Sequence, residues 1–75
     1  MDIKDFIENF FNQFDDTELS EFSATTKFRE LDEWSSLTAL AVLNMISKKY
    51  GKTVKADEMK ATDTILELYN LVVSK

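Results

Sequence analysis

The stretch "SSLTALAVLNMISKKYG", residues 35–51, has the pattern of a complete helix with both of its ends marked. Apolar residues recur at three- and four-residue spacing, which is typical of an amphipathic helix. Lys48 and Lys49 fall in the last turn, where cations complement the helix dipole, and Gly51 offers the left-handed conformation that ends a helix. We therefore predict a helix over residues 36–50. Its apolar face, which we expect to join Met59, Ile65 and Leu68 in the core, consists of Leu37, Leu40, Val42, Leu43, Met45, Ile46 and Tyr50.

A second amphipathic segment lies near the N-terminus. Its apolar stripe consists of Ile3, Phe6, Ile7, Phe10, Phe11 and Phe14. Asp2 is a suitable N-cap, and Asp5 lies near the positive end of the helix dipole. We predict a helix over residues 3–14 that packs its phenylalanines into the core, because a domain this small needs large side chains there.

The remaining predicted helices are shorter. Residues 56–60, "ADEMK", form at most one or two turns, and a last helix covers residues 64–73. Three residues are candidates for the cap of this last helix: Thr62, Asp63 and Thr64, of which the last has capping-box spacing to Glu67.

A long connection, residues 15–35, joins the first two predicted helices and lacks sustained periodicity. We expect only a short helical turn in it, near Thr17–Phe22. The chain has no proline and one glycine, which favours helices over a sheet with tight turns. The predicted fold is therefore all-α: a small four-helix bundle in a single domain, residues 1–75, with three main helices, a short third helix and a long loop between helices 1 and 2.

The residue inventory excludes several classes of function. Cysteine and histidine are absent, which removes disulfides, thiolate metal sites, the usual general base and the commonest transition-metal ligand. The longest apolar run, Ala39–Leu43, is far short of the roughly 20 residues of a membrane helix. We expect no catalytic residue, no metal site and no membrane insertion, in a cytoplasmic monomer.

The net charge of −5 is unevenly distributed. Residues 1–33 carry ten acids and three bases, a net of −7, whereas residues 34–75 carry four acids and six lysines, a net of +2. Net acidity argues against binding to nucleic acid, which relies on clustered lysine and arginine.

Two serines, Ser35 and Ser36, directly precede the apolar part of the predicted helix 36–50. Serine is common at helix starts because its hydroxyl accepts a hydrogen bond from an otherwise unpaired backbone N–H. Taken alone, the position of these two serines at the start of the predicted helix indicates a helix cap.

From Phe28 almost to the C-terminus, the sequence "FRELDEWSSLTALAVLNMISKKYGKTVKADEM…TDTILEL" resembles the acyl carrier protein family. In that family an Asp-Ser-Leu motif opens the second helix, and its serine carries 4′-phosphopantetheine. Ser36 and Leu37 match the Ser-Leu of this motif, and Tyr50 stands at the family's position for an aromatic residue. The "EW-x-SL" form is similar to discrete carriers of specialised pathways.

The resemblance implies that a phosphopantetheinyl transferase moves the prosthetic arm from coenzyme A to Ser36, with Ser35 the less favoured acceptor. The arm's thiol would carry an acyl or aminoacyl group as a thioester, delivered by an activating ligase and passed to an acyltransferase or synthase. Such a protein is not itself an enzyme. The surface expected to recognise partners consists of Trp34, Leu37, Thr38 and Ala41. For Trp34 the favoured alternative is that it packs the end of the long loop against the bundle.

Two features depart from the family pattern. Ser35 replaces the acid before the serine, and the helix 36–50, which is acidic in the family, holds no acid and ends in Lys48 and Lys49. Because long-range steering follows charge placement, we expect partners other than the enzymes of a generic fatty-acid synthase. An alternative stays open, in which the chain is an unmodified helical interaction module whose serines only cap a helix.

Overall fold

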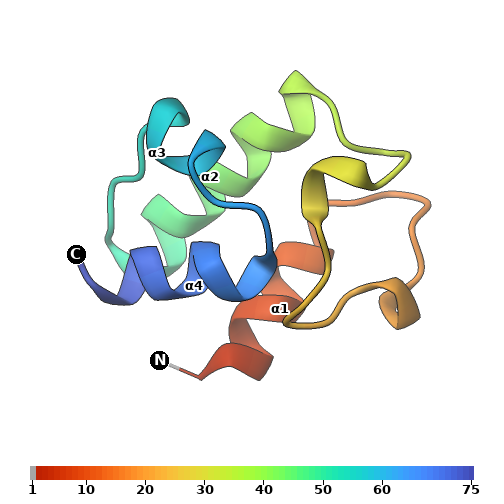
Figure 1. Cartoon of the computed structure of the whole chain (residues 1–75), viewed down its shortest axis with the longest axis horizontal. Helices are drawn as coiled ribbons and strands as arrows, with labels where there is room; N and C mark the ends of the chain where they lie inside the picture. Colours follow the sequence, from red (N-terminus) through yellow and green to blue (C-terminus); the bar gives the residue numbers. More distant parts are fainter. Residues whose placement is uncertain (1) are drawn as a thin grey trace.

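The computed structural model describes residues 2–75, which form helices joined by loops (Figure 1). The elements, in chain order, are α1 (Ile3–Phe11), the 3₁₀ turns η1 (Leu19–Glu21) and η2 (Phe28–Glu30), α2 (Ser36–Tyr50), α3 (Ala56–Lys60) and α4 (Ile65–Val73). The predicted all-α arrangement is confirmed, with three main helices, one short helix and a long loop after the first. None of the helices between residues 2 and 75 has the length and apolar character of a bilayer-spanning segment.

The first helix, α1, begins where the sequence predicts and ends earlier. The Asp2 carboxylate caps it by accepting a hydrogen bond from the backbone N–H of Lys4 at 3.2 Å. The predicted end at Phe14 is wrong, because the helix ends at Phe11. The N–H groups of Gln13 and Phe14 donate to carbonyls only three residues back, so the chain leaves the helix in a tighter turn. This turn still places the Phe14 ring in the core.

The second helix, α2, has the predicted boundaries. At its start, Ser35 has an extended backbone, and its side chain accepts a hydrogen bond from the N–H of Thr38 at 3.3 Å. At its end, Gly51 adopts φ 66° and donates its N–H to the carbonyl of Ser47 at 3.1 Å. Both ends therefore use the residues that mark them in the sequence.

The predicted core face of α2 is partly wrong. Val42, Met45 and Ile46 are buried, but Leu37 and Leu40 are exposed by 79% and 62%. Apolar residues surround much of this helix, so their periodicity does not determine which side packs inward. Val42 and Ile46 lie in the same buried cluster as Phe6 and Phe10 of α1, and the two leucines are left on the surface.

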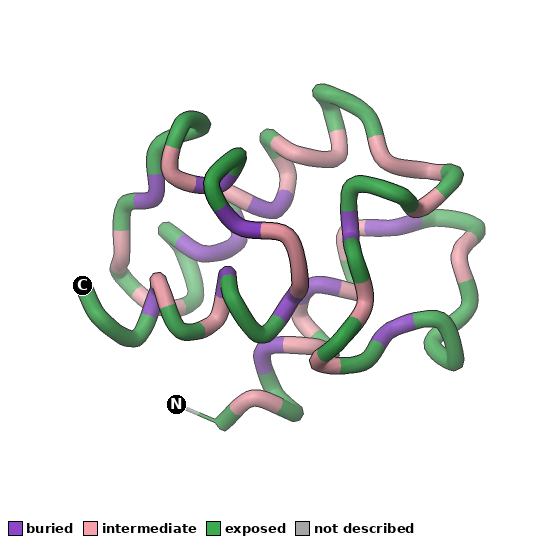
Figure 2. Tube along the Cα trace, viewed as in Figure 1, coloured by how far each residue is buried: buried purple, intermediate pink, exposed green. Residues whose placement is uncertain are grey.

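Aromatic rings dominate the core. Phe10 of α1 is fully buried, and its ring centroid lies 5.6–6.4 Å from those of Phe6, Phe14, Phe22, Phe28 and Trp34. The rest of the core comes from α2, α3, α4 and the segment before α3: Val42, Met45, Ile46, Val54, Met59, Ile65, Leu68 and Val72. Figure 2 shows how buried positions alternate with exposed ones along the helices.

The long loop is fixed to the start of α4. The N–H groups of Ile65 and Leu66 donate to the carbonyls of Thr26 and Ala24 at 3.1 and 2.9 Å. These bonds pair backbone groups that the first turn of a helix leaves without partners. The loop is therefore part of the packed structure rather than a free connection.

Of the candidate caps of α4, Thr64 is the one the structure uses. Its hydroxyl accepts a hydrogen bond from the N–H of Glu67 at 3.2 Å, and the Glu67 carboxylate accepts from the Thr64 N–H at 3.1 Å. This is the predicted capping box. The same carboxylate accepts from the N–H of Asp63 at 2.6 Å, and these backbone hydrogen bonds hold the pKa of Glu67 below its usual value.

Candidate functional site

Ser35 and Ser36 are neighbours at the start of α2, but their hydroxyl groups have different surroundings. Besides its bond from the Thr38 N–H, Ser35 Oγ lies 3.2 Å from the Thr38 hydroxyl. That hydroxyl donates in turn to the carbonyl of Glu33 at 3.0 Å. The Ser35 hydroxyl thus belongs to the hydrogen-bonded structure that starts the helix.

Ser36 is the first residue of α2 and is exposed. Among residues 2–75, no group forms a hydrogen bond with its hydroxyl or with the backbone N–H groups of Ser36 and Leu37. Free N–H groups and the positive end of the helix dipole favour an anion at this position. Ser36 therefore presents an accessible hydroxyl where a phosphate would be stabilised.

Glu33 holds the long loop against the start of α2. Its carboxylate accepts hydrogen bonds from the Thr17 hydroxyl at 2.6 Å and from the N–H groups of Asp15 and Asp16, both at 2.8 Å. These bonds, that of Thr17 above all, hold the pKa of Glu33 below its usual 4.5. Because the Glu33 carbonyl accepts the bond from Thr38, this one residue joins the loop after α1 to the first turn of α2.

Trp34 anchors the segment before the serines. Its half-buried ring is nearly parallel to that of Phe10, with an angle of 4° and a centroid distance of 6.3 Å, and lies 5.1 Å from the Phe28 ring. These contacts give Trp34 a packing role. Its indole also lines the cavity beside Ser36, so packing and contact with a bound group are compatible.

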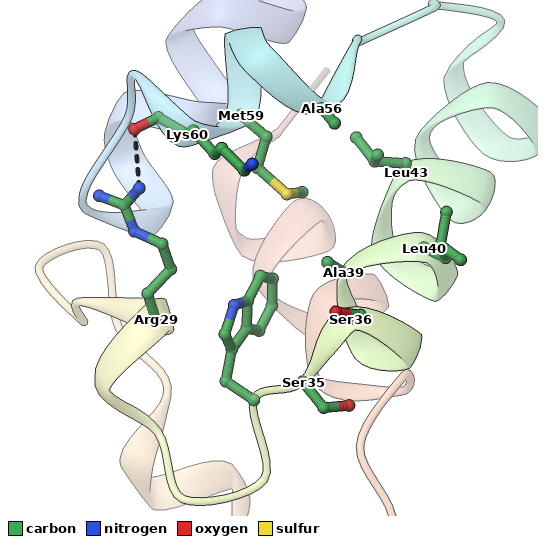
Figure 3. Close-up of a pocket in the computed structure, with 10 residues that line it drawn as sticks. Arg29, Ser35, Ser36, Ala39, Leu40, Leu43, Ala56, Met59 and Lys60 are labelled. Atoms are coloured by element: carbon green, nitrogen blue, oxygen red, sulfur yellow. Dashed lines mark hydrogen bonds between the residues drawn. The ribbon is translucent and has the colours of Figure 1, made fainter.

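A cavity of about 500 Å³ lies beside Ser36, between α2, η2 and α3 (Figure 3). Its lining is mostly apolar and comes from Trp34, Ala39, Leu40, Leu43, Ala56 and Met59, with Arg29, Ser35, Ser36 and Lys60 completing it. An apolar space next to an exposed hydroxyl can take a flexible apolar group attached to that hydroxyl.

Two contacts hold α3 in place at this cavity. Arg29 donates from Nη1 to the carbonyl of Lys60 at 2.7 Å, the bond drawn in Figure 3, and its other terminal nitrogen lies 3.6 Å from the Asp63 carboxylate. At the other side of α3, Lys75 pairs with Glu58 at 2.7 Å. The cavity wall formed by α3 is thus tied both to η2 and to the C-terminal end of the described chain.

A family model described as the phosphopantetheine attachment site matches residues 5–72, nearly the whole chain. The chain belongs to this family of carrier proteins. Such a carrier is not catalytic; it bears a covalent 4′-phosphopantetheine group that phosphopantetheinyl transferases attach, and it serves partner enzymes. Comparison with curated proteins and with solved structures finds no significant match.

The start of α2 fits the prosthetic group of a carrier. Ser36 offers a free hydroxyl, and the first turn of the helix contains no acid that would repel a phosphodiester. The cavity beside it has room for part of an attached chain. The surroundings of Ser36 therefore suit the attachment of such a group.

The residues expected to recognise partners lie at different depths around Ser36. Leu37 is the most exposed of them, and Thr38, Ala41 and Trp34 are half-buried. The hydroxyl of Thr38 is already bonded within the carrier, as described above. Leu37, with the exposed Leu40, therefore offers the carrier's most accessible apolar contact near Ser36.

The structural roles of Glu33 and Arg29 do not follow from the sequence pattern. In the sequence, Glu33 is one of several acids in the loop, and its partners at residues 15–17 lie far back along the chain. Arg29 likewise bonds to Lys60 across a wide sequence separation. The family-like dipeptide "EW" is the signal that could have drawn attention to Glu33.

Proposed function

We propose that residues 1–75 act as one carrier domain with its prosthetic arm attached to Ser36. The observation that carries this proposal is the difference between the two serines. The hydroxyl of Ser35 is bonded to Thr38, whereas that of Ser36 is exposed and makes no hydrogen bond within residues 2–75. Ser35 is the less favoured acceptor because its modification would remove the cap of α2.

In the attachment reaction, Ser36 Oγ forms a bond to the pantetheine phosphorus of coenzyme A. The bond between that phosphorus and the bridging oxygen breaks, and adenosine 3′,5′-bisphosphate leaves. The serine proton passes to a base on the transferase, which also holds Mg²⁺. The free N–H groups and dipole of α2 then stabilise the charge of the phosphodiester.

The arm supplies a thiol, a nucleophile that the cysteine-free chain lacks, to hold an acyl or aminoacyl group as a thioester. The proposed partners are an activating ligase and an acyltransferase or synthase. The mostly apolar cavity beside Ser36 supports an acyl cargo. We propose that partners contact Leu37, with Trp34, Thr38 and Ala41 around it.

A second candidate function is an unmodified interaction module. The exposure of Leu37 and Leu40 and the replacement of the family's acid by Ser35 favour it. The two functions differ in one decisive respect: a carrier is covalently modified, whereas an interaction module is not.

Intact mass spectrometry tests the proposal. The wild-type chain, Ser35→Ala and Ser36→Ala would each be incubated with coenzyme A, Mg²⁺ and a broad-specificity phosphopantetheinyl transferase. We expect a gain of one phosphopantetheine in the wild type and in Ser35→Ala, and none in Ser36→Ala. Absence of any gain with several transferases would favour the interaction module.

A further inference from the structure

The cavity beside Ser36 is lined by charge of one sign only. Of its 10 lining residues, Arg29 and Lys60 are basic and none is acidic. Its volume of about 500 Å³ is within the roughly 300–1,000 Å³ typical of small-molecule sites. The cavity therefore combines room for a ligand, a mostly apolar lining and positive charge.

The two basic side chains at this cavity are not equivalent. The Arg29 guanidinium is already paired, because it donates to the carbonyl of Lys60 at 2.7 Å and lies 3.6 Å from the Asp63 carboxylate. The Lys60 ammonium forms neither a hydrogen bond nor an ion pair with any residue from 2 to 75. Of the two, Lys60 is therefore the one whose charge is available to a ligand.

Lys60 is the last residue of α3 and is exposed. Figure 3 shows its side chain on the α3 side of the cavity, with Leu40 and Leu43 on the α2 side. A lysine can lay its aliphatic stem on apolar surface while its ammonium stays in water. A ligand in this cavity would therefore contact apolar side chains along its length and a cation at its edge.

The proposed attachment at Ser36 determines which groups reach the cavity. Because Ser36 is itself a lining residue, a group carried by the arm has a high effective concentration there. A neutral acyl chain would leave the Lys60 ammonium unpaired, and a cargo with a free amino group would be repelled by it. The phosphodiester has its own donors at the start of α2, the free N–H groups of Ser36 and Leu37. The anion that best complements Lys60 is therefore a carboxylate on the cargo.

We propose that Lys60 determines the class of cargo, and that the carrier shelters acyl groups with a carboxylate at the end remote from the thioester. The apolar part of such a group lies in the cavity, and its carboxylate pairs with the Lys60 ammonium. The inference rests on the proposed function, since it assumes attachment at Ser36. It narrows the cargo from acyl or aminoacyl groups to ω-carboxyacyl groups.

Hydrolysis of two matched thioesters tests the inference. A broad-specificity transferase would load the chain from hexanoyl- or adipyl-coenzyme A, whose acyl groups have equal chain length and differ in the terminal carboxylate. Intact mass spectrometry then follows the loss of each acyl group, which is slower when the cargo is sheltered. Lys60→Met removes the charge but keeps a long apolar side chain and the carbonyl that Arg29 uses. It should shorten the half-life of the adipyl thioester about threefold relative to the hexanoyl thioester, and less at high salt.

The matched control is Lys49→Met, the same substitution at an exposed position of α2 that does not line the cavity. It should leave the ratio of the two half-lives unchanged. The indole N–H signal of Trp34, a lining residue and the chain's single tryptophan, should shift on adipyl loading, and less so in Lys60→Met. Equal effects of Lys60→Met on both thioesters would show that Lys60 responds to the phosphodiester or to shape, and would overturn the inference. Failure of the wild-type chain to accept any phosphopantetheine would instead overturn the proposed function.

Discussion

At the scale of single residues, Ser35 and Ser36 should respond differently to loss of their hydroxyl groups. Ser35→Ala removes the N-cap of α2 and should lower the free energy of unfolding by about 1 kcal/mol. Ser36→Ala removes a hydroxyl that has no hydrogen bond within residues 2–75, so the change should be within about 0.5 kcal/mol. Urea unfolding of the unmodified chains measures both values. Equal losses would contradict the assignment of the cap to Ser35.

Glu33 should make the stability of the protein depend on pH. Its pKa is lowered in the folded state, so its contribution to stability is fully present above the usual glutamate value of 4.5 and is lost as pH falls through the lower folded pKa. We expect the Tm of Glu33→Gln to fall less than that of the wild type between about pH 7 and about pH 3.

Thermal unfolding followed by circular dichroism measures this difference. Glu8→Gln, an exposed glutamate for which no such hydrogen bonds exist among the described residues, is the control and should keep the wild-type pH dependence. If Tm changed with pH by the same amount in the wild type and in Glu33→Gln, the Glu33 carboxylate would not hold the loop after α1 in place.

At the scale of elements, the end of α2 depends on the backbone conformation of Gly51. Its φ of 66° lies in the left-handed region, and a Cβ placed there would have no atom within 4 Å. Gly51→Ala should therefore cost about 1 kcal/mol through backbone conformation alone, without a steric clash. Gly51→Asn, which tolerates this region better, should cost less. Urea unfolding measures both, and an alanine variant as stable as wild type would contradict the assignment.

The helices with local end signals could be predicted from the sequence. The boundaries of α2 follow from Ser35 and Gly51, and the start of α4 follows from Thr64, because each signal lies within a few residues of the end it marks. The end of α1 at Phe11 could not be predicted, since the apolar stripe continues to Phe14 through a tighter turn.

The candidate site could be predicted only in part, because sequence signals are local and much of the site is formed by residues that are distant in sequence. Attachment at Ser36 stays a prediction, made from the family-like Ser-Leu motif, which is local; the structure shows that this residue is exposed at the start of α2. The burial of Val42 rather than Leu40 depends on how α2 packs against the rest of the core, and the cavity depends on where α3 lies. The hydrogen bonds of Glu33 join loop ends that are distant in sequence, and periodicity carries no information about such pairs.

At the scale of the whole molecule, a network of rings centred on Phe10 connects α1 to the loop that leads to Ser36. Phe10→Ala should lower the free energy of unfolding by about 3–5 kcal/mol, a large fraction of the roughly 5–15 kcal/mol typical of a domain. Leu37→Ala, at an exposed position, should change it by less than about 0.5 kcal/mol. Denaturant unfolding compares them, and similar losses would place Leu37 in the core.

This arrangement separates the tasks of stability and presentation. Phenylalanines and the inner side of α2 form the core, while Ser36, Leu37, Leu40 and the cavity stay accessible at the other side of the same helix. The proposed attachment at Ser36 needs this separation, because a modified residue must be open to partner enzymes without loss of the fold.

Tandem mass spectrometry of the wild-type chain tests the central claim most directly. After incubation with coenzyme A, Mg²⁺ and a transferase, trypsin cleavage after Arg29 and Lys48 releases residues 30–48, which contain both serines. Fragment ions that divide the peptide between Ser35 and Ser36 locate the added group. We predict the phosphopantetheine on Ser36; its presence on Ser35, or an unmodified peptide, would contradict the account.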